Sequence, residues 1–476
     1  MAMTSKSKGQ RGRRRVTVTL GASVMVLASV LLAVPAIGTA GADSSSTITY
    51  SVSPVAIQAT SSTSKPSQTP AQCIAFAGLA CYTPQILHTA YRVPWTIDGK
   101  WAGTGQQIAI VDAFGSPTVA ADLAIYDAAF GLPAANLHVY YPNGKVPYSL
   151  IAQRSLQAGW AEETSLDVQT VHDFAPGARI NLIVASSPNG NDLNVAERYA
   201  VTNNLGDVMS MSFGAPEIAI AGGGNNLQLQ QADAIYRQAA SQLMGVFASS
   251  GDSGAGNGYP TANALFPASD PNVTSTGGTN LFVAADTSSS VTSTDGTWTG
   301  ETTWNDSDPS TCPFGCLDGI FGATGGAASS VFSAASYQSA ASGLSARTTS
   351  DVSFNSSVYT GTLIYIGFLP TGSNGFYFFG GTSEASPSWA AIAADLNQAH
   401  GSDLGPLNPI LYALAAKPKT YAADFHDVTI GNNKFLYPTG PGSAARVGYD
   451  EPTGLGTPIV AGLLKSLGAA GSTYGY

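Results

Sequence analysis

Hydrophobic residues gather in short runs that alternate with helix-like patterns along most of the chain. Four of the runs are almost continuously apolar, which is typical of strands covered on both faces of a parallel sheet. They are residues 106–113, 179–186, 207–213 and 244–251. After Asn226, apolar residues recur at spacings of three and four up to Leu243, which predicts an amphipathic helix. The alternation predicts an α/β, doubly wound fold, with helices on both faces of a mainly parallel sheet and functional groups where its strands end.

The N-terminus has the pattern of an export signal. Six basic residues precede an uncharged run from Val16 to Ala42, which ends in the small residues Ala40, Gly41 and Ala42. We therefore predict that residues 1–42 are a cleaved secretory signal peptide and that the protein is secreted, with no membrane segment after cleavage. An uncleaved membrane anchor is the alternative, because the run is long enough to span a bilayer.

The rest of the chain divides into two parts. Residues 43–70 are rich in Ser, Thr and Pro and lack periodicity, so we predict that residues 43–81 are a flexible lead-in or short pro-region. From residue 82 to residue 476 the composition is even, which predicts one large domain.

Charge and cysteine content narrow the class of protein. The signal holds six of the 20 basic residues and none of the 30 acidic ones, which leaves 14 against 30, a net charge of −16. Such an acidic chain argues against nucleic acid as a partner, and its low content of charged residues suits a secreted protein in an acidic medium. The four cysteines favour two short-loop disulfides, Cys73 with Cys81 and Cys312 with Cys316. "CPFGC" could instead be half a metal site, but no second Cys/His pair accompanies it.

A candidate nucleophile lies in "FGGTSEASPSW". Ser383 follows an apolar run and a Gly-Gly turn, and it precedes a predicted helix with Pro387 in its first turn. This position places the hydroxyl near the positive end of a helix, although a helix N-cap is the commonest role of such a serine. A nucleophilic serine needs a base, and none of the five histidines lies in a His-Gly-Thr setting.

Three carboxylic acids are candidates for the missing base and its partners. Glu163 and Asp167 are four residues apart on a predicted helix and so share one face, and Asp252 follows the apolar run 244–251 in a glycine turn. Solvated acids on a surface helix and an ordinary turn aspartate are the alternatives.

The blocks "EETSLD", "SSGDSG" and "GGTSEASP", in this order, resemble the sedolisins, or serine-carboxyl peptidases. "YTPQILHTAY", "FPASDPNVTSTGGT", "ETTWND" and "TGLGTP" add to a resemblance that covers about Tyr82 to Pro458. It implies a subtilisin-like fold and a secreted endopeptidase or tripeptidyl peptidase that acts on polypeptides. By position, it implies the following roles: Ser383 as nucleophile, Glu163 as general base, Asp167 as the carboxylate that orients Glu163, and Asp252 as the oxyanion partner.

The chemistry that the resemblance implies requires an acidic medium. A glutamate next to an aspartate can share a proton with it, and Asp252 must be protonated to donate a hydrogen bond to an oxyanion. We therefore expect proteolysis with an acidic optimum.

The C-terminal blocks "DFHDVTIGNN" and "ARVGYD" resemble the calcium loop of the family. The resemblance implies one structural Ca²⁺, bound by the side chains of Asp427 and Asp450 and by the carbonyl oxygens of Val428, Arg446 and Gly448. Arg446 replaces a usual glycine and Tyr449 a usual tryptophan. Two turn aspartates without an ion are the alternative.

Two other features depart from the family. Asp112 and Phe213 stand where its prototypes have a glutamate and a tryptophan behind the base, and Phe213 cannot donate a hydrogen bond. Family members usually have a long folded prodomain, whereas about forty residues separate the predicted signal from the expected domain here. We therefore expect either a different maturation or folding without that chaperone.

Two other functions compete with this one. A Ser-His-Asp peptidase would use His172, which lies five residues beyond Asp167, about 140° around the helix, and should face elsewhere. A secreted, sedolisin-like binding protein with an inactive site is the other alternative. A monomer is expected in either case.

Overall fold

The computed structural model describes residues 48–52, 54–148, 154–221, 226–288, 294–315, 322–370 and 372–476. The predicted signal peptide, residues 1–42, lies outside these ranges. Within them, we find no helix with both the length and the apolar character that a membrane span requires.

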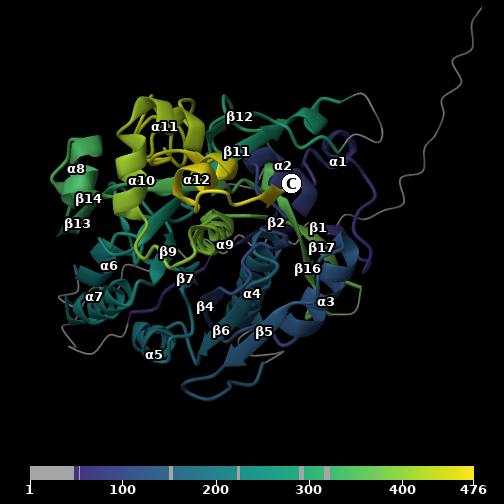
Figure 1. Cartoon of the computed structure of the whole chain (residues 1–476), viewed down its shortest axis with the longest axis horizontal. Coiled ribbons are helices and arrows are strands. Elements are labelled where there is room, and N and C mark those ends of the chain that lie inside the picture. Colours follow the sequence, from purple (N-terminus) through teal and green to yellow (C-terminus); the bar gives the residue numbers. More distant parts are fainter. Residues whose placement is uncertain are drawn as a thin grey trace, which may run out of the picture.

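An eight-stranded sheet runs through the centre of the molecule (Figure 1). Its strand order is β12-β11-β9-β7-β4-β6-β5, with β15 paired to β11. All neighbours are parallel except β12, which pairs antiparallel with β11. The strands are β4 (Gln107–Ala113), β5 (Asn136–Tyr140), β6 (Arg179–Ala185), β7 (Val208–Met211), β9 (Gly245–Ser249), β11 (Thr274–Val283), β12 (Trp298–Thr303) and β15 (Val352–Asn355).

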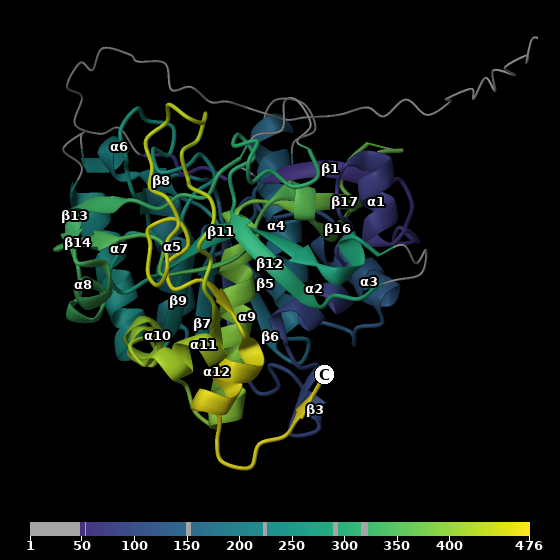
Figure 2. The same ribbon diagram turned by 90° about the horizontal axis from the view of Figure 1, so that it is seen from above.

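Helices cover both faces of this sheet (Figures 1 and 2). On one face α4 and α9 pack against each other and α9 contacts β7 and β9, whereas on the other α5 and α7 pack together against β6 and β9. The helices are α1 (Pro70–Ala77), α2 (Pro84–Tyr91), α3 (Val119–Phe130), α4 (Arg154–Phe174), α5 (Gly190–Thr202), α6 (Glu217–Ala221), α7 (Asn226–Ser241), α8 (Ser336–Ser342), α9 (Thr382–His400), α10 (Asn408–Ala415), α11 (Pro418–Asp424) and α12 (Val460–Leu467).

The four apolar runs form β4, β6, β7 and β9, as predicted, and the helix after Asn226 is α7. In β4, Ile108 and Ile110 belong to the core under α4 and α9, whereas Ala109 and Val111 belong to the core under α5 and α7. Successive side chains of a strand point to opposite faces, so the stretch of β4 that both cores cover, residues 108–111, is apolar throughout. The predicted doubly wound α/β fold is confirmed.

Shorter strands form small sheets around the main one. The order β1-β17-β16 makes a three-stranded antiparallel sheet beside α9, and another three-stranded sheet has the order β20-β2-β3. The remaining strands are β1 (Val55–Thr60), β2 (Thr96–Ile97), β3 (Lys100–Trp101), β8 (Ala215–Pro216), β10 (Leu265–Phe266), β13 (Ala328–Ser333), β14 (Ala346–Thr348), β16 (Thr362–Ile366), β17 (Gly375–Gly380), β18 (Phe425–His426), β19 (Thr457–Pro458) and β20 (Tyr474–Gly475).

The segment before residue 82 is more regular than its composition predicts. Residues 55–60 form β1, which pairs with β17, and residues 70–77 form α1, whose N-terminus is closed by a capping box between Thr69 and Gln72. The prediction of a flexible lead-in is therefore wrong for these stretches, because β1 pairs with a distant strand and a capping box closes the start of α1. The predicted disulfide between Cys73 and Cys81 is present. Cys312 is also disulfide-bonded, while its predicted partner Cys316 lies outside the described residues.

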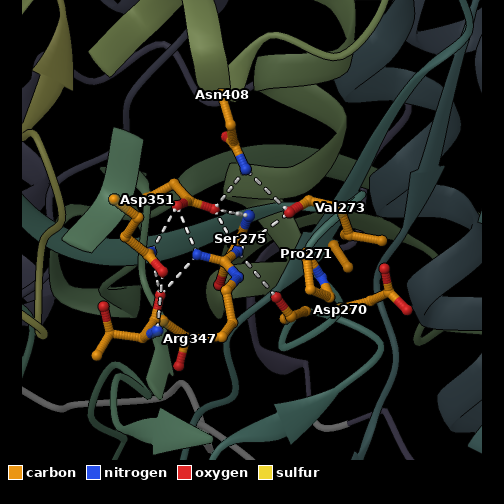
Figure 3. Close-up of polar contacts among 12 residues, drawn as sticks. Asp270, Pro271, Val273, Ser275, Arg347, Asp351 and Asn408 are labelled. Carbon is orange, nitrogen blue, oxygen red and sulfur yellow. Dashed lines mark hydrogen bonds and ion pairs between the residues drawn. The ribbon is translucent and has the colours of Figure 1, made fainter. Parts of the chain in front are cut away.

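A buried ion pair joins β14, the start of β11 and α10 (Figure 3). The guanidinium of Arg347 donates two hydrogen bonds to the carboxylate of Asp351, from Nη1 to Oδ1 at 2.7 Å and from Nη2 to Oδ2 at 2.5 Å. The same carboxylate accepts hydrogen bonds from Asn408 Nδ2 at 3.1 Å and from the backbone N–H of Ser275 at 2.8 Å. We call these residues the Arg347 hub.

Candidate active site

Ser383 lies in the first turn of α9, immediately after the three-stranded sheet that contains β17. The helix begins at Thr382, and its N-cap is Gly381, which has a φ of 129°. Ser383 is therefore not the N-cap, and its hydroxyl lies near the positive end of a 19-residue helix. Pro387 was expected in the first turn, but it lies in the second turn because the helix starts earlier than its sequence suggests.

Pro387 leaves one carbonyl of α9 without its helical partner. A proline has no backbone N–H, so the carbonyl of Ser383, four residues before it, cannot accept the usual helical hydrogen bond. The hydroxyl of Ser212, just after β7, lies 3.2 Å from that oxygen and 2.7 Å from Oδ1 of Asp167. Ser212 therefore joins the backbone of the candidate nucleophile to one of the candidate acids.

Glu163 and Asp167 lie on the part of α4 that faces α9, and both side chains are fully buried. The alternative of solvated acids on a surface helix is therefore wrong. Burial raises the pKa of Glu163 well above its usual range, and the charges of Asp167, Asp112 and Asp252 add to this effect. Neither Glu163 oxygen accepts a hydrogen bond of regular geometry within the described residues, but the Ser383 hydroxyl is close enough to lower the pKa of this carboxyl.

Asp112 adds a third buried acid at the carboxyl end of β4. Burial raises its pKa to about 7, an effect that the Thr164 hydroxyl partly offsets. Burial also raises the pKa of Asp167 well above its usual range, with a further contribution from the charge of Asp112. Asp112, which departs from the family pattern, is thus close enough for its charge to raise the pKa of both Glu163 and Asp167.

Asp252 approaches from the carboxyl end of β9 and meets the first turn of α9. Its Oδ1 accepts hydrogen bonds from the backbone N–H and the hydroxyl of Thr382, both at 2.7 Å. The backbone N–H of Gly251 donates to the same Thr382 hydroxyl at 3.1 Å. A β-carbon on Gly381 would lie 3.0 Å from Oδ2 of Asp252, so a glycine lets the carboxyl lie close to the helix end. Desolvation raises the pKa of Asp252 to about 6.

The four acids form a cluster of like charges, which we call the acid cluster: Asp112, Glu163, Asp167 and Asp252. Among the described residues, no lysine, arginine or histidine contributes to the pKa shift of any of them. Buried acids without a countercharge retain protons, and they can therefore exchange protons with a neighbouring hydroxyl. The arrangement is suited to acid–base chemistry on the Ser383 hydroxyl.

His172 does not belong to this site. Its Nε2 lies 2.9 Å from the carbonyl oxygen of Pro133 and 3.3 Å from Asp127, on the side of α4 that packs against α3. Burial lowers its pKa. The alternative of a Ser-His-Asp arrangement is wrong, as its angular position on the helix predicts.

Sequence analysis missed two hydroxyl groups of the site, those of Ser212 and Thr382. Thr382 lies inside the block "GGTSEASP" that carries the family resemblance, whereas Ser212 lies just after β7 and outside the blocks that carry it. The departure Phe213 is buried between Tyr50, at a ring distance of 5.6 Å, and Trp160, at 5.9 Å. The Phe213 side chain therefore packs against aromatic rings in the core beside this site.

The residues expected to bind calcium lie together in the C-terminal loops. Burial raises the pKa of Asp450 to about 6, and the charge of Asp427 contributes, so the two carboxyls are neighbours. Backbone N–H groups donate to them, from Arg446 to Asp450 at 2.9 Å and from Gly448 to Asp427 at 3.0 Å. Arg446 does not have a positive φ, so an arginine fits where the family usually has glycine.

The other ligands expected for calcium are backbone carbonyl oxygens of the C-terminal loops. Within the described ranges, no hydrogen bond reaches the carbonyl oxygens of Val428, Arg446 or Gly448. No group of three or more His, Cys, Asp or Glu side chains in those ranges could hold a metal ion. The residues present fit a hard cation only if backbone oxygens supply part of the coordination.

The sequence is similar to those of known peptidases. Residues 151–414 match the model of the subtilase family. Kumamolisin from Bacillus sp. (strain MN-32) is 31% identical over 416 residues, which are 82% of this chain and 64% of that protein. Sedolisin from Pseudomonas sp. (strain 101) is 32% identical over 392 residues, 79% of this chain and 60% of that protein. This chain thus spans 60–64% of the length of these two relatives.

A solved structure described as Pseudomonas sedolisin (serine-carboxyl proteinase), complexed with two molecules of pseudo-iodotyrostatin, has a similar fold. It superposes with a TM-score of 0.66 at 28% identity, and the match covers 82% of this chain and 98% of that one. The chain belongs to the subtilase family. Within that family its sequence and fold are similar to those of the sedolisins, or serine-carboxyl peptidases, and the expected subtilisin-like architecture is confirmed.

Proposed function

We propose that this chain is a serine-carboxyl peptidase that hydrolyses polypeptides in an acidic medium. In this proposal the Ser383 oxygen attacks the carbonyl carbon of the peptide bond and its proton passes to Glu163, which Asp167 orients. The resulting oxyanion accepts a hydrogen bond from protonated Asp252. Glu163 then returns the proton to the departing amine, and water hydrolyses the ester formed on Ser383.

The observation that carries the proposal is the acid cluster beside Ser383, which has no cationic partner among the described residues. The raised pKa of Glu163 makes its ionised form a stronger proton acceptor than an isolated glutamate. The pKa of Asp252, about 6, keeps it protonated in acid. Since Asp252 loses that proton as the pH rises through about 6, we expect activity to fall above this pH.

The test is cleavage of denatured casein between pH 3 and pH 7 by purified variants. Glu163→Gln should lower kcat by about 10³-fold or more, because an amide cannot accept the serine proton, and Ser383→Ala should abolish turnover. His172→Ala on the same helix is the matched control and should keep activity within about tenfold. Full activity of Glu163→Gln, or an optimum near pH 8, would contradict the proposal.

We further propose one structural Ca²⁺, bound by Asp427 and Asp450 with carbonyl oxygens of Val428, Arg446 and Gly448. An ion would relieve the repulsion between the two carboxyls and hold the C-terminal loops together.

At free calcium 100 times Kd, binding should stabilise the fold by about 2.7 kcal/mol. A chelator should therefore lower Tm by several degrees, and Asp427→Asn should remove this response. Asp295→Asn, in an exposed turn, should retain it; a response that survives Asp427→Asn would place the ion elsewhere.

Export and domain boundaries complete the proposal. Residues 1–42 would be removed on secretion, and residues 82–476 would form the catalytic domain of a monomer. Intact mass spectrometry of secreted protein tests the signal, because a mature chain that still contains Val16–Ala42 would contradict it. A light-scattering mass of twice the chain would contradict the monomer.

A further inference from the structure

Residues 432–444 form a hairpin in the loop between α11 and α12, and we call it the C-terminal hairpin. Its arms pair through the bridge between Asn432 and Ala444 and through the N–H of Asn433, which donates to the carbonyl of Ser443 at 3.2 Å. The tip, residues 435–441, connects the two arms. In Figure 2 the yellow loop of this region rises well beyond α11 and α12, alongside β11.

Buried amide groups hold the base of the hairpin. Asn433 is fully buried, and its Nδ2 donates to the carbonyl oxygens of Gly325 at 2.8 Å and of Gly326 at 2.9 Å. Asn305 is also fully buried, and its Nδ2 donates to the carbonyl oxygen of Lys434 at 3.0 Å. Buried amides with satisfied donors fix the backbone around them, so the tip is carried on a rigid support.

A turn rich in glycine links the hairpin to the candidate active site. The N–H of Ala255 donates to the carbonyl of Asn433 at 3.1 Å. A β-carbon on Gly254 would lie 2.6 Å from the β-carbon of Phe435, so the turn and the start of the tip are in close contact. Gly254 is two residues after Asp252, at most about 7 Å along an extended chain. The tip therefore begins at the edge of the site, on the side of the proposed oxyanion partner.

The tip presents apolar side chains to solvent. Leu436 is 63% exposed and Tyr437, the next residue, is 43% exposed. Leu436 has a φ of 60°, in the left-handed region that is unfavourable for a residue with a β-carbon. Between residues 428 and 449 the chain has two basic residues, Lys434 and Arg446, and no acidic one. Adjacent apolar side chains that are exposed on a rigid loop contribute little to packing, and they are typical of contact with another molecule.

The position of the tip favours a polypeptide substrate as that molecule. An extended chain advances about 3.3 Å per residue, so the side chains two or three residues from the cut bond lie about 7–10 Å along the substrate. This span is similar to the chain length between Asp252 and Gly254, where the tip begins. An apolar substrate side chain that packs on Leu436 and Tyr437 would remove apolar surface of both partners from water. A membrane surface or a second copy of this chain could also cover the tip, but neither would explain its contact with the Asp252 turn.

We propose that Leu436 and Tyr437 form a subsite for an apolar side chain of the polypeptide substrate, two or three residues from the bond that is cut. The inference rests on the proposed peptidase function, since that function defines the ligand. It assigns a substrate class, extended segments with an apolar residue at one fixed distance from the cut bond. Leu436 and Tyr437 are specificity-determining residues, because they contact the substrate and take no part in proton transfer.

Cleavage of short alanine-based peptides, with Leu, Ser or Asp at each position in turn, tests the proposal. The double variant Leu436→Ser, Tyr437→Ser should lower kcat/KM by about tenfold for peptides with Leu at the matching position, mainly through KM, and should leave the Ser and Asp peptides within about twofold. The matched controls are Ile430→Ser and Val447→Ser, which change side chains that are 58% and 83% exposed outside the hairpin, and both should retain the native preference.

Three results would overturn the subsite. They are an unchanged preference of the double variant, an equal loss for the Leu, Ser and Asp peptides, and a change confined to the binding of phosphatidylglycerol vesicles or to the oligomeric state. The last result would assign the tip to a membrane surface or to a second copy of this chain.

A binding measurement separates this inference from the proposed function. The Ser383→Ala variant should bind the fluorescein-labelled Leu peptide about tenfold more tightly than the Ser peptide in an anisotropy assay, and adding Leu436→Ser and Tyr437→Ser should remove this difference. Such selective binding, without cleavage of any peptide or of casein by the unmodified protein, would refute the peptidase function and leave the subsite intact. Cleavage by the unmodified protein, with binding and kcat/KM that do not depend on the tip, would overturn the subsite and leave the peptidase function intact.

Discussion

The acid cluster, in which Asp252 is half-buried and the other three acids are buried, and the buried Arg347 hub both contain ionisable groups, but only the hub has its charges paired. In the hub, the Arg347–Asp351 pair is completed by hydrogen bonds from Asn408, Tyr412 and the backbone of Ser275. In the acid cluster, both oxygens of Asp112 and of Glu163 lack a hydrogen bond of regular geometry among the described residues. The first arrangement satisfies its charges, whereas the second lowers its net charge by retaining protons that its members share, so that one member can still be ionised.

This difference separates a structural role from a chemical one. A buried arginine with a bidentate carboxylate has one stable ionisation state, which fixes the strands around it. Neighbouring acids without a cation have several states that differ by the position of a proton, and this is the property that proton transfer needs. Similar burial therefore has opposite consequences for stability and for reactivity.

The largest effect is expected from breaking the hub. Arg347→Met would leave Asp351 buried with no countercharge, so the free energy of unfolding should fall by about 3–5 kcal/mol. Urea unfolding measures this. The control is Arg237→Met, which removes an exposed i,i+4 pair with Asp233 and should cost no more than about 1 kcal/mol. A loss for Arg347→Met as small as that of the control would show that the hub does not stabilise the fold.

Asp252 should give the next largest effect, on activity. Asp252→Ala removes the proposed oxyanion donor, so kcat should fall by about 10²–10³-fold. Asp252→Asn restores a donor that does not titrate, so it should recover part of this loss and retain activity above pH 6, where the native carboxyl ionises. The measurement is the pH dependence of kcat for the three proteins. A fall near pH 6 that persists unchanged in Asp252→Asn would assign that ionisation to another group.

The pH dependence of stability should follow the unpaired acids. Burial raises the pKa of Asp112 to about 7, of Asp306 to about 7 and of Glu384 to about 8, against about 4 in the unfolded chain. The folded protein therefore binds more protons than the unfolded chain between pH 4 and pH 8, and this contribution to stability is complete below pH 4 and is lost as the pH rises to about 8.

The free energy of unfolding should therefore fall from pH 4 to pH 8 by more than the ~1.4 kcal/mol that a shift of one pKa unit represents. Urea unfolding at pH 4, 6 and 8 measures it at constant ionic strength and calcium concentration. Stability that rises from pH 4 to pH 8 would show that these acids are not proton-binding groups of the folded state.

Local patterns were sufficient to predict four of the eight strands of the main sheet, β4, β6, β7 and β9, and the residues of the candidate site. The middle of a strand that is buried on both faces is apolar, as residues 108–111 of β4 are, so such a run can be recognised without its neighbours. The motif blocks identify Ser383, Glu163, Asp167 and Asp252, and the fold brings all four together. Their chemical roles remain predictions.

Long-range contacts could not be predicted in this way. The strand β1 exists because it pairs with β17, more than 300 residues later, and its own sequence resembles a flexible segment. The role of Ser212 depends on the carbonyl that Pro387 leaves free on another element. Neither contact has a local signal, because the stabilising partner is set by the topology.

The smallest effect is expected from Asp112→Asn. Because the pKa of Asp112 is raised to about 7, the native carboxyl is protonated in acid, and an asparagine has nearly its shape and charge in that state. Activity at pH 4 should therefore change by less than about tenfold, and differences from the native protein should appear only as the pH approaches 7. The comparison variant is Asp122→Asn, another buried acid, whose carboxyl accepts hydrogen bonds from Thr118 and from the backbone of Gly367. If Asp112→Asn instead lost more than about a hundredfold at pH 4, the carboxyl would have to be ionised in the working enzyme, and the acid cluster would carry a fixed charge as the hub does.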